Sequence, residues 1–174
     1  MKITSIAILS IALLTLLALF PSCGEKNAPP AGVLQIGLVC SNLDKSLDFY
    51  KNIVGMTETG GFEVDGQFGT DSGLSDGKPF KVRMLKLEDT PHATTLKLAC
   101  CSDSAGIKPN FVTDAPGVRY ITFEVPSTKA VKERFSKNGI RLLGKCPVSM
   151  GDNQELILVQ DPDGVFVEII GGKE

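Results

Sequence analysis

The chain has 174 residues, with 18 lysines and arginines against 20 aspartates and glutamates and a formal net charge of −2 at pH 7. This near balance, without a basic patch or aromatic residues interleaved with basic ones, excludes the electrostatic footprint of a nucleic-acid-binding protein. Beyond the N-terminal region about 140 residues remain, which suits one domain with a sizeable hydrophobic core.

Residues 1–22 have the pattern of a secretory signal peptide. Lys2 precedes an uncharged apolar run, and the small residue Ser22 stands directly before Cys23. A cysteine in that position resembles the lipobox of bacterial lipoproteins, which implies that Cys23 becomes the lipidated first residue of the mature chain. An uncleaved membrane anchor and ordinary secretion are the alternatives. All three place the domain outside the cytoplasm, on the periplasmic or cell-surface side.

Residues 23–32 are expected to form a tether between the anchor and the domain. They contain Pro29 and Pro30, which stiffen the backbone, and they show no apolar periodicity. The folded domain is therefore expected to span residues 33–171.

A strand, a helix and three further strands are predicted in the first half of this domain. The apolar run "VLQIGLVCSN" predicts the first strand, and "LDKSLDFYKNIVG" predicts the helix. The apolar positions of this helix recur at helical spacing: Leu43, Leu47, Tyr50 and Val54. Ser41 or Asn42 is expected to cap the start of the helix, and Gly55 to end it.

Strands are then expected at "MTETGGFEV", "FKVRMLKLE" and "TTLKLACC". Residues 65–79, between the first two, are rich in Gly, Asp and Ser and too long for a simple hairpin turn. Two interpretations of this loop remain open: a lid over a pocket, or a surface loop.

The same order of elements returns from Val118 at an offset of about 85 residues, which indicates a duplicated unit. The second helix, "TKAVKERFSKNG", carries Val131 and Phe135 on one face, with Ser127 as the expected cap and Gly139 as the expected end. Strands are predicted before it at "VRYITFEVPS" and after it at "IRLLGKCPVSM", "ELILVQ" and "VFVEII". The sequence "DPDG" predicts a tight turn that makes residues 159–170 a hairpin.

The stretches "IGLVCSNLDKSLDFYKNIVGM" and "DPDGVFVEI" resemble the opening and closing motifs of the vicinal oxygen chelate superfamily, which includes glyoxalase I, extradiol dioxygenases and bleomycin- and fosfomycin-resistance proteins. The resemblance implies an α+β fold of two tandem βαβββ units, residues 33–101 and 118–171. Their sheets are expected to curve together into a cup of mixed strands around one cavity.

Four apolar strands each carry one residue that their neighbours do not predict: Gln35, Lys97, Tyr120 and Glu168. Burying an unpaired polar group costs about 1–3 kcal/mol, so such residues face a pocket, a partner or solvent. The resemblance implies that all four lie on the cavity floor, where metal-dependent members carry His, Gln or Glu. We therefore predict that these four residues contact a small-molecule ligand. For Gln35 and Tyr120, packing with a satisfied hydrogen bond is the alternative.

The resemblance also implies that the usual metal site is lost. Gln35 and Glu168 fit the ligand pattern, whereas Lys97 stands where Glu is typical and Tyr120 where His is typical. An ammonium among the ligands would repel a divalent cation, because like unit charges about 4 Å apart cost ~4 kcal/mol at an effective dielectric constant of 20. No cofactor is therefore expected. In the alternative, a divalent metal bound by Gln35 and Glu168 would be the cofactor.

Lys97 is a candidate counter-ion for Glu168. A salt bridge that closes the cavity, ligand contact and catalysis, with Glu168 as the best catalytic candidate, are all open. Arg83 faces either the cup or solvent, and His92 is expected at the surface. A single histidine also excludes the usual serine or cysteine nucleophile arrangements.

Four cysteines follow Cys23: Cys40, Cys100, Cys101 and Cys146. Their spacing shows no zinc-binding pattern. Buried thiols, or a disulfide from Cys40 to Cys100 or Cys101 in an oxidising compartment, are both open.

Three functions follow from these expectations. The first is a lipid-anchored module that binds a small molecule in its cup without a metal. The second is a metal-dependent lyase or isomerase of the glyoxalase I (lactoylglutathione lyase) type, in which the metal would stabilise an enediolate. The third is an interaction protein that works as a homodimer without a ligand.

Overall fold

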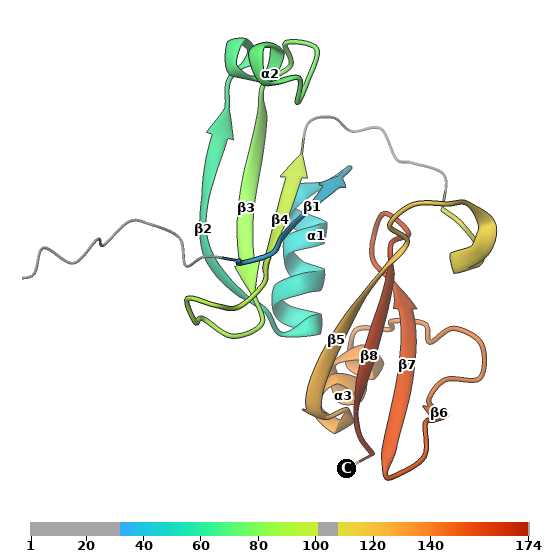
Figure 1. Ribbon diagram of the computed structural model, residues 1–174. Coiled ribbons are helices and arrows are strands. Elements are labelled where there is room, and N and C mark those ends of the chain that lie inside the picture. Colours follow the sequence, from blue (N-terminus) through green and yellow to red (C-terminus); the bar gives the residue numbers. More distant parts are fainter. Residues whose placement is uncertain (1–31, 101–107, 174) are drawn as a thin grey trace, which may run out of the picture.

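The computed structural model describes residues 32–100 and 108–173, which form two curved sheets, each with a helix against one face (Figure 1). The expected signal peptide, the expected lipidation site Cys23, nearly all of the expected tether and Cys101 lie outside these residues. No helix in the described part of the chain is long and apolar enough to cross a membrane.

Unit 1 contains four strands and a helix that changes character along its length. Its strands and helices are β1 Gln35–Cys40, α1 Leu43–Leu47, the π-helical continuation η1 Asp48–Val54, β2 Thr57–Val64, α2 Gly66–Ser72, β3 Phe80–Lys86 and β4 Thr95–Cys100. The side chain of Asn42 accepts a hydrogen bond from the Lys45 N–H, and Gly55 ends the helix at φ 104°. Both expected helix ends are therefore confirmed.

Unit 2 repeats the order strand, helix and three strands. After the 3₁₀ turn η2 Val112–Asp114, its elements are β5 Tyr120–Ser127, α3 Lys129–Lys137, β6 Val148–Ser149, β7 Gln154–Gln160 and β8 Phe166–Gly172. The predicted hairpin of residues 159–170 is confirmed, because β7 and β8 pair antiparallel from Gln160↔Phe166 onward. The tandem βαβββ architecture and the α+β class are as expected.

The two sheets have equivalent strand orders, β1-β4-β3-β2 and β5-β8-β7-β6. In each sheet the first strand pairs parallel with the last strand of its unit, and the remaining pairs are antiparallel. One face of each sheet packs on its helix, and we call the opposite face the open face. The buried side chains of both units form a single hydrophobic core.

Two expectations for the connecting segments were wrong. The expected loop 65–79 contains α2, which Asp65 caps by accepting the Phe68 N–H at 2.8 Å. Of the predicted strand "IRLLGKCPVSM", only the short β6 forms; Leu143 still donates its N–H to the Leu158 carbonyl at 2.8 Å. The local Asp65 cap supports α2, whereas the second segment pairs with β7 only through Val148 and Ser149.

The two units are joined at their helices. Arg134 on α3 donates hydrogen bonds to the carbonyl oxygens of Ile53 and Val54 at 2.7 and 2.9 Å. These carbonyls belong to the last turn of the first helix, where backbone acceptors have no partner within the helix. A positive charge there also interacts favourably with the helix dipole. Arg134 therefore caps the helix of the other unit.

The β7–β8 turn makes a second junction between the units. Tyr50 on η1 donates its hydroxyl to Asp161 Oδ2 at 2.9 Å, and Ser41 donates its N–H and hydroxyl to Asp163 at 3.1 and 2.5 Å. The turn itself is held by Asp161 Oδ1, which accepts the N–H groups of Asp163 and Val165. The carboxylates of "DPDG" thus position unit 1 as well as forming a turn.

Candidate functional site

The strand register places Lys97 and Glu168 at equivalent positions of the two units. On β1 and β4, Gln35 pairs with Thr95, and Lys97 follows two residues later on the same face. On β5 and β8, Tyr120 pairs with Phe166, and Glu168 follows two residues later. Side chains two residues apart on a strand lie on the same face. All four predicted site residues therefore lie on open faces, in a matched arrangement.

Lys97 is half-buried beside a position without a side chain. Its register partner on β1 is Gly37, and its Nζ lies 5.8 Å from the centroid of the Phe62 ring on β2. That distance allows a cation–π attraction, which requires the amine to be protonated. Lys97 makes no hydrogen bond or ion pair with another described residue, so its donors are available to a ligand.

Glu168 has a different partner from the expected one. Thr122, its register partner on β5, donates its hydroxyl to Glu168 Oε2 at 2.6 Å. Among the described residues no ion pair joins Glu168 to Lys97, so the hypothesis that these two residues form a salt bridge is wrong. Lys97 lies on the sheet of unit 1 and Glu168 on the sheet of unit 2. The Oε1 atom of Glu168 is left as an acceptor for a ligand.

The open edges of the two sheets border a slot of about 490 Å³ between β1 and β5. Its walls are mainly apolar and include Ile36, Met56, Leu87, Leu96, Ile121 and Phe123. Tyr120, which is 53% exposed, and Thr122 lie along one side, and Glu88 and Glu124 also line it. A volume of 300–1,000 Å³ with apolar walls and few polar groups is typical of small-molecule sites. Gln35 is exposed on β1 between two lining residues, Leu34 and Ile36.

The donor set does not fit a divalent metal. Such ions take carboxylate, carbonyl, imidazole or thiolate ligands. Gln35 and Glu168 supply two oxygen donors, whereas Lys97 supplies a cation and Tyr120 a neutral phenol. No cluster of three or more His, Cys, Asp or Glu side chains able to hold a metal occurs within residues 32–100 and 108–173.

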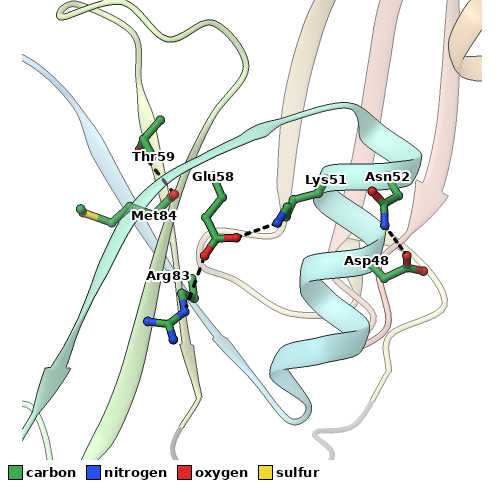
Figure 2. Close-up of polar contacts among 7 residues, drawn as sticks. All are labelled: Asp48, Lys51, Asn52, Glu58, Thr59, Arg83 and Met84. Carbon is green, nitrogen blue, oxygen red and sulfur yellow. Dashed lines mark hydrogen bonds and ion pairs between the residues drawn. The ribbon is translucent and has the colours of Figure 1, made fainter.

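Arg83 and His92 lie outside this arrangement. Arg83 alternates with Met84, the register partner of Lys97, so it lies on the helix-side face of its sheet. Its Nε lies 3.6 Å from a carboxylate oxygen of Glu58, and this carboxylate also accepts a hydrogen bond from Lys51 at 2.7 Å. Figure 2 shows this network.

His92 is exposed in the β3–β4 connection, as expected. The helix α2 contributes no residue to the slot, which does not support the lid interpretation.

Cys40, Cys100 and Cys146 are free thiols in the structure. Cys40 and Cys100 are register partners on β1 and β4. Burial and the neighbouring Cys100 raise the pKa of the Cys40 thiol to about 12. A thiol held in its neutral form is a poor nucleophile and a poor metal ligand, so Cys40 acts as a core residue.

The sequence analysis did not identify two residues that contact the predicted site residues, Thr122 and Phe62. Thr122 follows Tyr120 by two residues in "YITFE", and this alternation could have placed it beside Glu168. Phe62 lies across two strand pairings from Lys97, so no local pattern pointed to it.

The sequence model of the Glyoxalase/Bleomycin resistance protein/Dioxygenase superfamily matches residues 32–169. This match covers most of the chain, and the chain therefore belongs to that superfamily. The resemblance seen in the two sequence motifs is thereby confirmed. No curated protein matches the chain significantly in sequence.

Solved structures of several superfamily members are similar to the chain. A glyoxalase family protein from Bacillus cereus has a TM-score of 0.67 at 19% identity, covering 86% of this chain and 99% of that one. A glyoxalase/bleomycin resistance protein/dioxygenase domain from Frankia sp. has a TM-score of 0.58 at 20% identity, covering 83% and 94%. The trypanothione-dependent glyoxalase I of Leishmania major has a TM-score of 0.57 at 19% identity, covering 80% and 85%. These similarities establish the fold.

Proposed function

We propose that this protein is an extracytoplasmic, lipid-anchored member of the superfamily that binds a small molecule in the slot between β1 and β5 without a metal ion. The single observation that carries the absence of a metal is Lys97, which lies on the open face of β4 and not among the residues that line the slot. Its side-chain amine occupies the position at which a carboxylate ligand is typical in the superfamily, and its Nζ lies 5.8 Å from the centroid of the Phe62 ring.

The electrostatic argument can be made quantitative. A divalent cation placed about 4 Å from a protonated amine meets a repulsion of ~8 kcal/mol at an effective dielectric constant of 20, twice the value for unit charges. The Gln35 amide and one carboxylate would have to offset this repulsion as well as the loss of the hydration shell of the ion. Neutralising Lys97 would remove the repulsion but would still leave two ligands.

The chemistry of the slot indicates what kind of molecule it takes. Apolar walls favour a compact apolar body, and the half-exposed Tyr120 ring offers a surface for stacking on an aromatic ligand. The polar lining residues on the β5 side are Tyr120, Thr122 and Glu124, and Thr122 donates its hydroxyl to Glu168 on the neighbouring strand β8. A ligand with an apolar body and hydrogen-bond donors directed at this side would match both the apolar walls and the polar groups.

The location and the anchor rest on the sequence. The apolar N-terminal run and the small residue before Cys23 support export and lipidation. Free glutathione-type thiols are concentrated in the cytoplasm, so export also argues against a glyoxalase I reaction on a thiol adduct.

Native mass spectrometry of the purified protein tests the proposal. We expect a monomer or dimer mass without a stoichiometric transition metal, and a bound organic molecule that is lost from Tyr120→Leu. The exposed α3 variant Lys129→Gln is the matched control and should retain that molecule. A metal ion at one equivalent per chain, released by Glu168→Gln, would instead support the glyoxalase-type enzyme.

A further inference from the structure

We propose that Cys40 and Cys100 form a thiol–disulfide exchange site on the helix-side face of unit 1. Both are free thiols in the structure. The substrate is a small disulfide-bonded oxidant. Cys100 attacks this oxidant first, and Cys40 then completes a bridge between β1 and β4. The site lies on the opposite side of the sheet from the open face, and its hollow shares no lining residue with the slot between β1 and β5.

The strand register brings the two cysteine side chains together. Cys40 and Cys100 are the last residues of β1 and β4, and they are partners in the parallel pairing. Neighbouring strands lie about 4.8 Å apart, and the two Cα atoms of a disulfide are usually roughly 4.4–6.8 Å apart, so a bridge fits this backbone. Lys97 on the open face lies three positions before Cys100, so both sulfur atoms lie on the helix-side face.

The environment of Cys40 keeps its thiol neutral. Burial is the largest cause that raises the pKa of this thiol to about 12, and the neighbouring Cys100 is the second. The other titratable groups near Cys40 are Asp163 in the β7–β8 turn and Tyr50 on η1, and neither carries a positive charge that would stabilise a thiolate. Cys40 is therefore expected to react only with a sulfur atom that is held beside it.

Access from solvent sets the order of the two steps. Cys40 is 3% exposed and belongs to the hydrophobic core. Cys100 is partly exposed and lines a hollow of about 500 Å³. The other residues that line this hollow come from α1, from β2 and β3 and from the ends of the segment between them: Leu43, Glu63, Val64, Asp65, Pro79, Phe80 and Lys81. A small disulfide therefore reaches Cys100 and not Cys40.

Charged groups beside Cys100 are already paired. Glu63, Lys81, Cys100 and Cys40 are successive register partners across β2, β3, β4 and β1. Lys81 Nζ lies 3.6 Å from a carboxylate oxygen of Glu63, and both side chains are exposed. The side chain of Asp65 caps α2. The hollow therefore has no strong preference for an anion or a cation, and a neutral disulfide is a suitable probe.

The exchange balances without a further reactant. The thiolate of Cys100 attacks one sulfur of the oxidant RSSR, which forms a mixed disulfide and releases RS⁻; this thiolate takes up the proton that Cys100 lost. Cys40 then attacks the Cys100 sulfur, and its proton goes to the second RS⁻. One RSSR is reduced to two RSH, while the two cysteine thiols are oxidised to one disulfide. Disulfides of this kind persist outside the cytoplasm, where the proposed export would place the protein.

The bridge would constrain a segment that joins the two units. Ser41 follows Cys40 directly and donates its N–H and hydroxyl to Asp163 of unit 2. A covalent link between residues 40 and 100 also closes a long loop, which reduces the conformational freedom of the unfolded chain. We expect the bridged protein to melt about 10 °C above the reduced protein, and dithiothreitol to reverse this shift.

Titration of the reduced, purified protein with bis(2-hydroxyethyl) disulfide tests the inference by intact mass and peptide mapping. Cys101→Ser should form the same bridge as the wild type. Cys100→Ser should form no bridge and carry no adduct on Cys40. Cys40→Ser should stop at the mixed disulfide on Cys100, and Cys40→Ala repeats this test without a buried hydroxyl. Circular dichroism shows that each variant is folded.

The rate of the second step supplies a further test. The mixed disulfide of the wild type is isolated at acidic pH, freed of excess probe and transferred to a higher pH. Closure of the bridge should accelerate by about tenfold per pH unit between about pH 7 and pH 9, because the thiolate fraction of Cys40 rises throughout this range toward its pKa of about 12.

Three results would overturn the inference. A bridge that persists in Cys100→Ser and is lost in Cys101→Ser would make Cys101 the partner of Cys40. A mixed disulfide on Cys100 that never closes in the wild type would show that Cys40 is only a core residue. Equal melting temperatures of the bridged and reduced proteins would show that the pair does not constrain β1. The proposed function is tested separately, because its experiment measures metal content and a molecule bound near Tyr120.

Discussion

Tyr50 and Asp161, 111 residues apart in the chain, are joined by a buried hydrogen bond of 2.9 Å between the helix of unit 1 and the β7–β8 turn of unit 2. Tyr50 is fully buried, and Asp161 is 6% exposed. Burial raises the pKa of both groups, and the nearby Asp161 carboxylate further raises the pKa of the Tyr50 phenol. This contact couples the folding of the two units.

Tyr50→Phe is expected to destabilise the protein by roughly 1–3 kcal/mol, because it leaves the buried Asp161 Oδ2 without its donor. Urea unfolding at pH 7 measures the change. Tyr50→Phe/Asp161→Asn should cost less than the sum of the two single variants, as residues in contact are not additive. The exposed pair of Gln67 and Asp71 supplies a control: Gln67→Ala should change stability by less than about 0.5 kcal/mol. Equal effects of Tyr50→Phe and Gln67→Ala would contradict this account of the junction.

Alkaline pH should unfold the protein partly through Tyr50. The folded state holds the pKa of this phenol well above its ordinary value, whereas the unfolded chain ionises it near pH 10. The stability is therefore fully present below about pH 10 and falls as the pH rises above that value. Unfolding free energies measured between pH 8 and 11 should fall less steeply for Tyr50→Phe than for the wild type. Parallel curves would show that Tyr50 does not contribute.

Acidic pH should destabilise the folded protein partly through protonation of Glu155 on β7. Burial alone would raise the pKa of this carboxyl, but the hydrogen bonds from Lys132, at 2.6 Å, and Thr128 outweigh it and hold the pKa below its ordinary value. The stabilisation is present above about pH 4.3 and is lost as the pH falls from there through the folded pKa. Glu155→Gln should cost roughly 1–3 kcal/mol at pH 7 and flatten the acid limb of the stability curve. Glu133→Gln, at an exposed position, should leave that limb unchanged.

Two of the described thiols, Cys40 and Cys146, should differ in reactivity. Cys40 is 3% exposed and its pKa is raised to about 12 by burial and by Cys100, so iodoacetamide at pH 8 should not alkylate it in the folded protein. Cys146 is more exposed and should react. Mass spectrometry of labelled peptides, with and without urea, distinguishes the two. Modification of Cys40 without urea would mean that the β1–β4 edge opens locally.

The parts of the fold that were predicted correctly depend on periodicity and turn chemistry. The alternation in "ELILVQ" and "VFVEII", with a turn between them, specified the β7–β8 hairpin without reference to the rest of the molecule. Likewise, the offset of about 85 residues between the two halves predicted that the two units repeat the same order of elements. Such signals are local, so a single sequence is sufficient to detect them.

The features that were missed depend on contacts between distant residues. Asp161 and Asp163 were read as turn residues, yet their carboxylates receive hydrogen bonds from Tyr50 and Ser41 in the other unit. The expected pairing of Lys97 with Glu168 placed two charges together that the structure keeps on separate sheets. The helix α2 carries two glycines, Gly66 and Gly69, which lower helix propensity, and its Asp65 cap supports it.

The central claim is that the protonated amine of Lys97 prevents metal binding at this site. Metal content after equilibration with Zn²⁺ and gel filtration, measured by inductively coupled plasma mass spectrometry, tests this directly when the wild type is compared with Lys97→Glu/Tyr120→His. The double variant restores the residue types typical of metal-dependent relatives. We predict no stoichiometric metal in the wild type and about one ion per chain in the double variant. One ion per chain in the wild type, lost in Glu168→Gln, would contradict the claim.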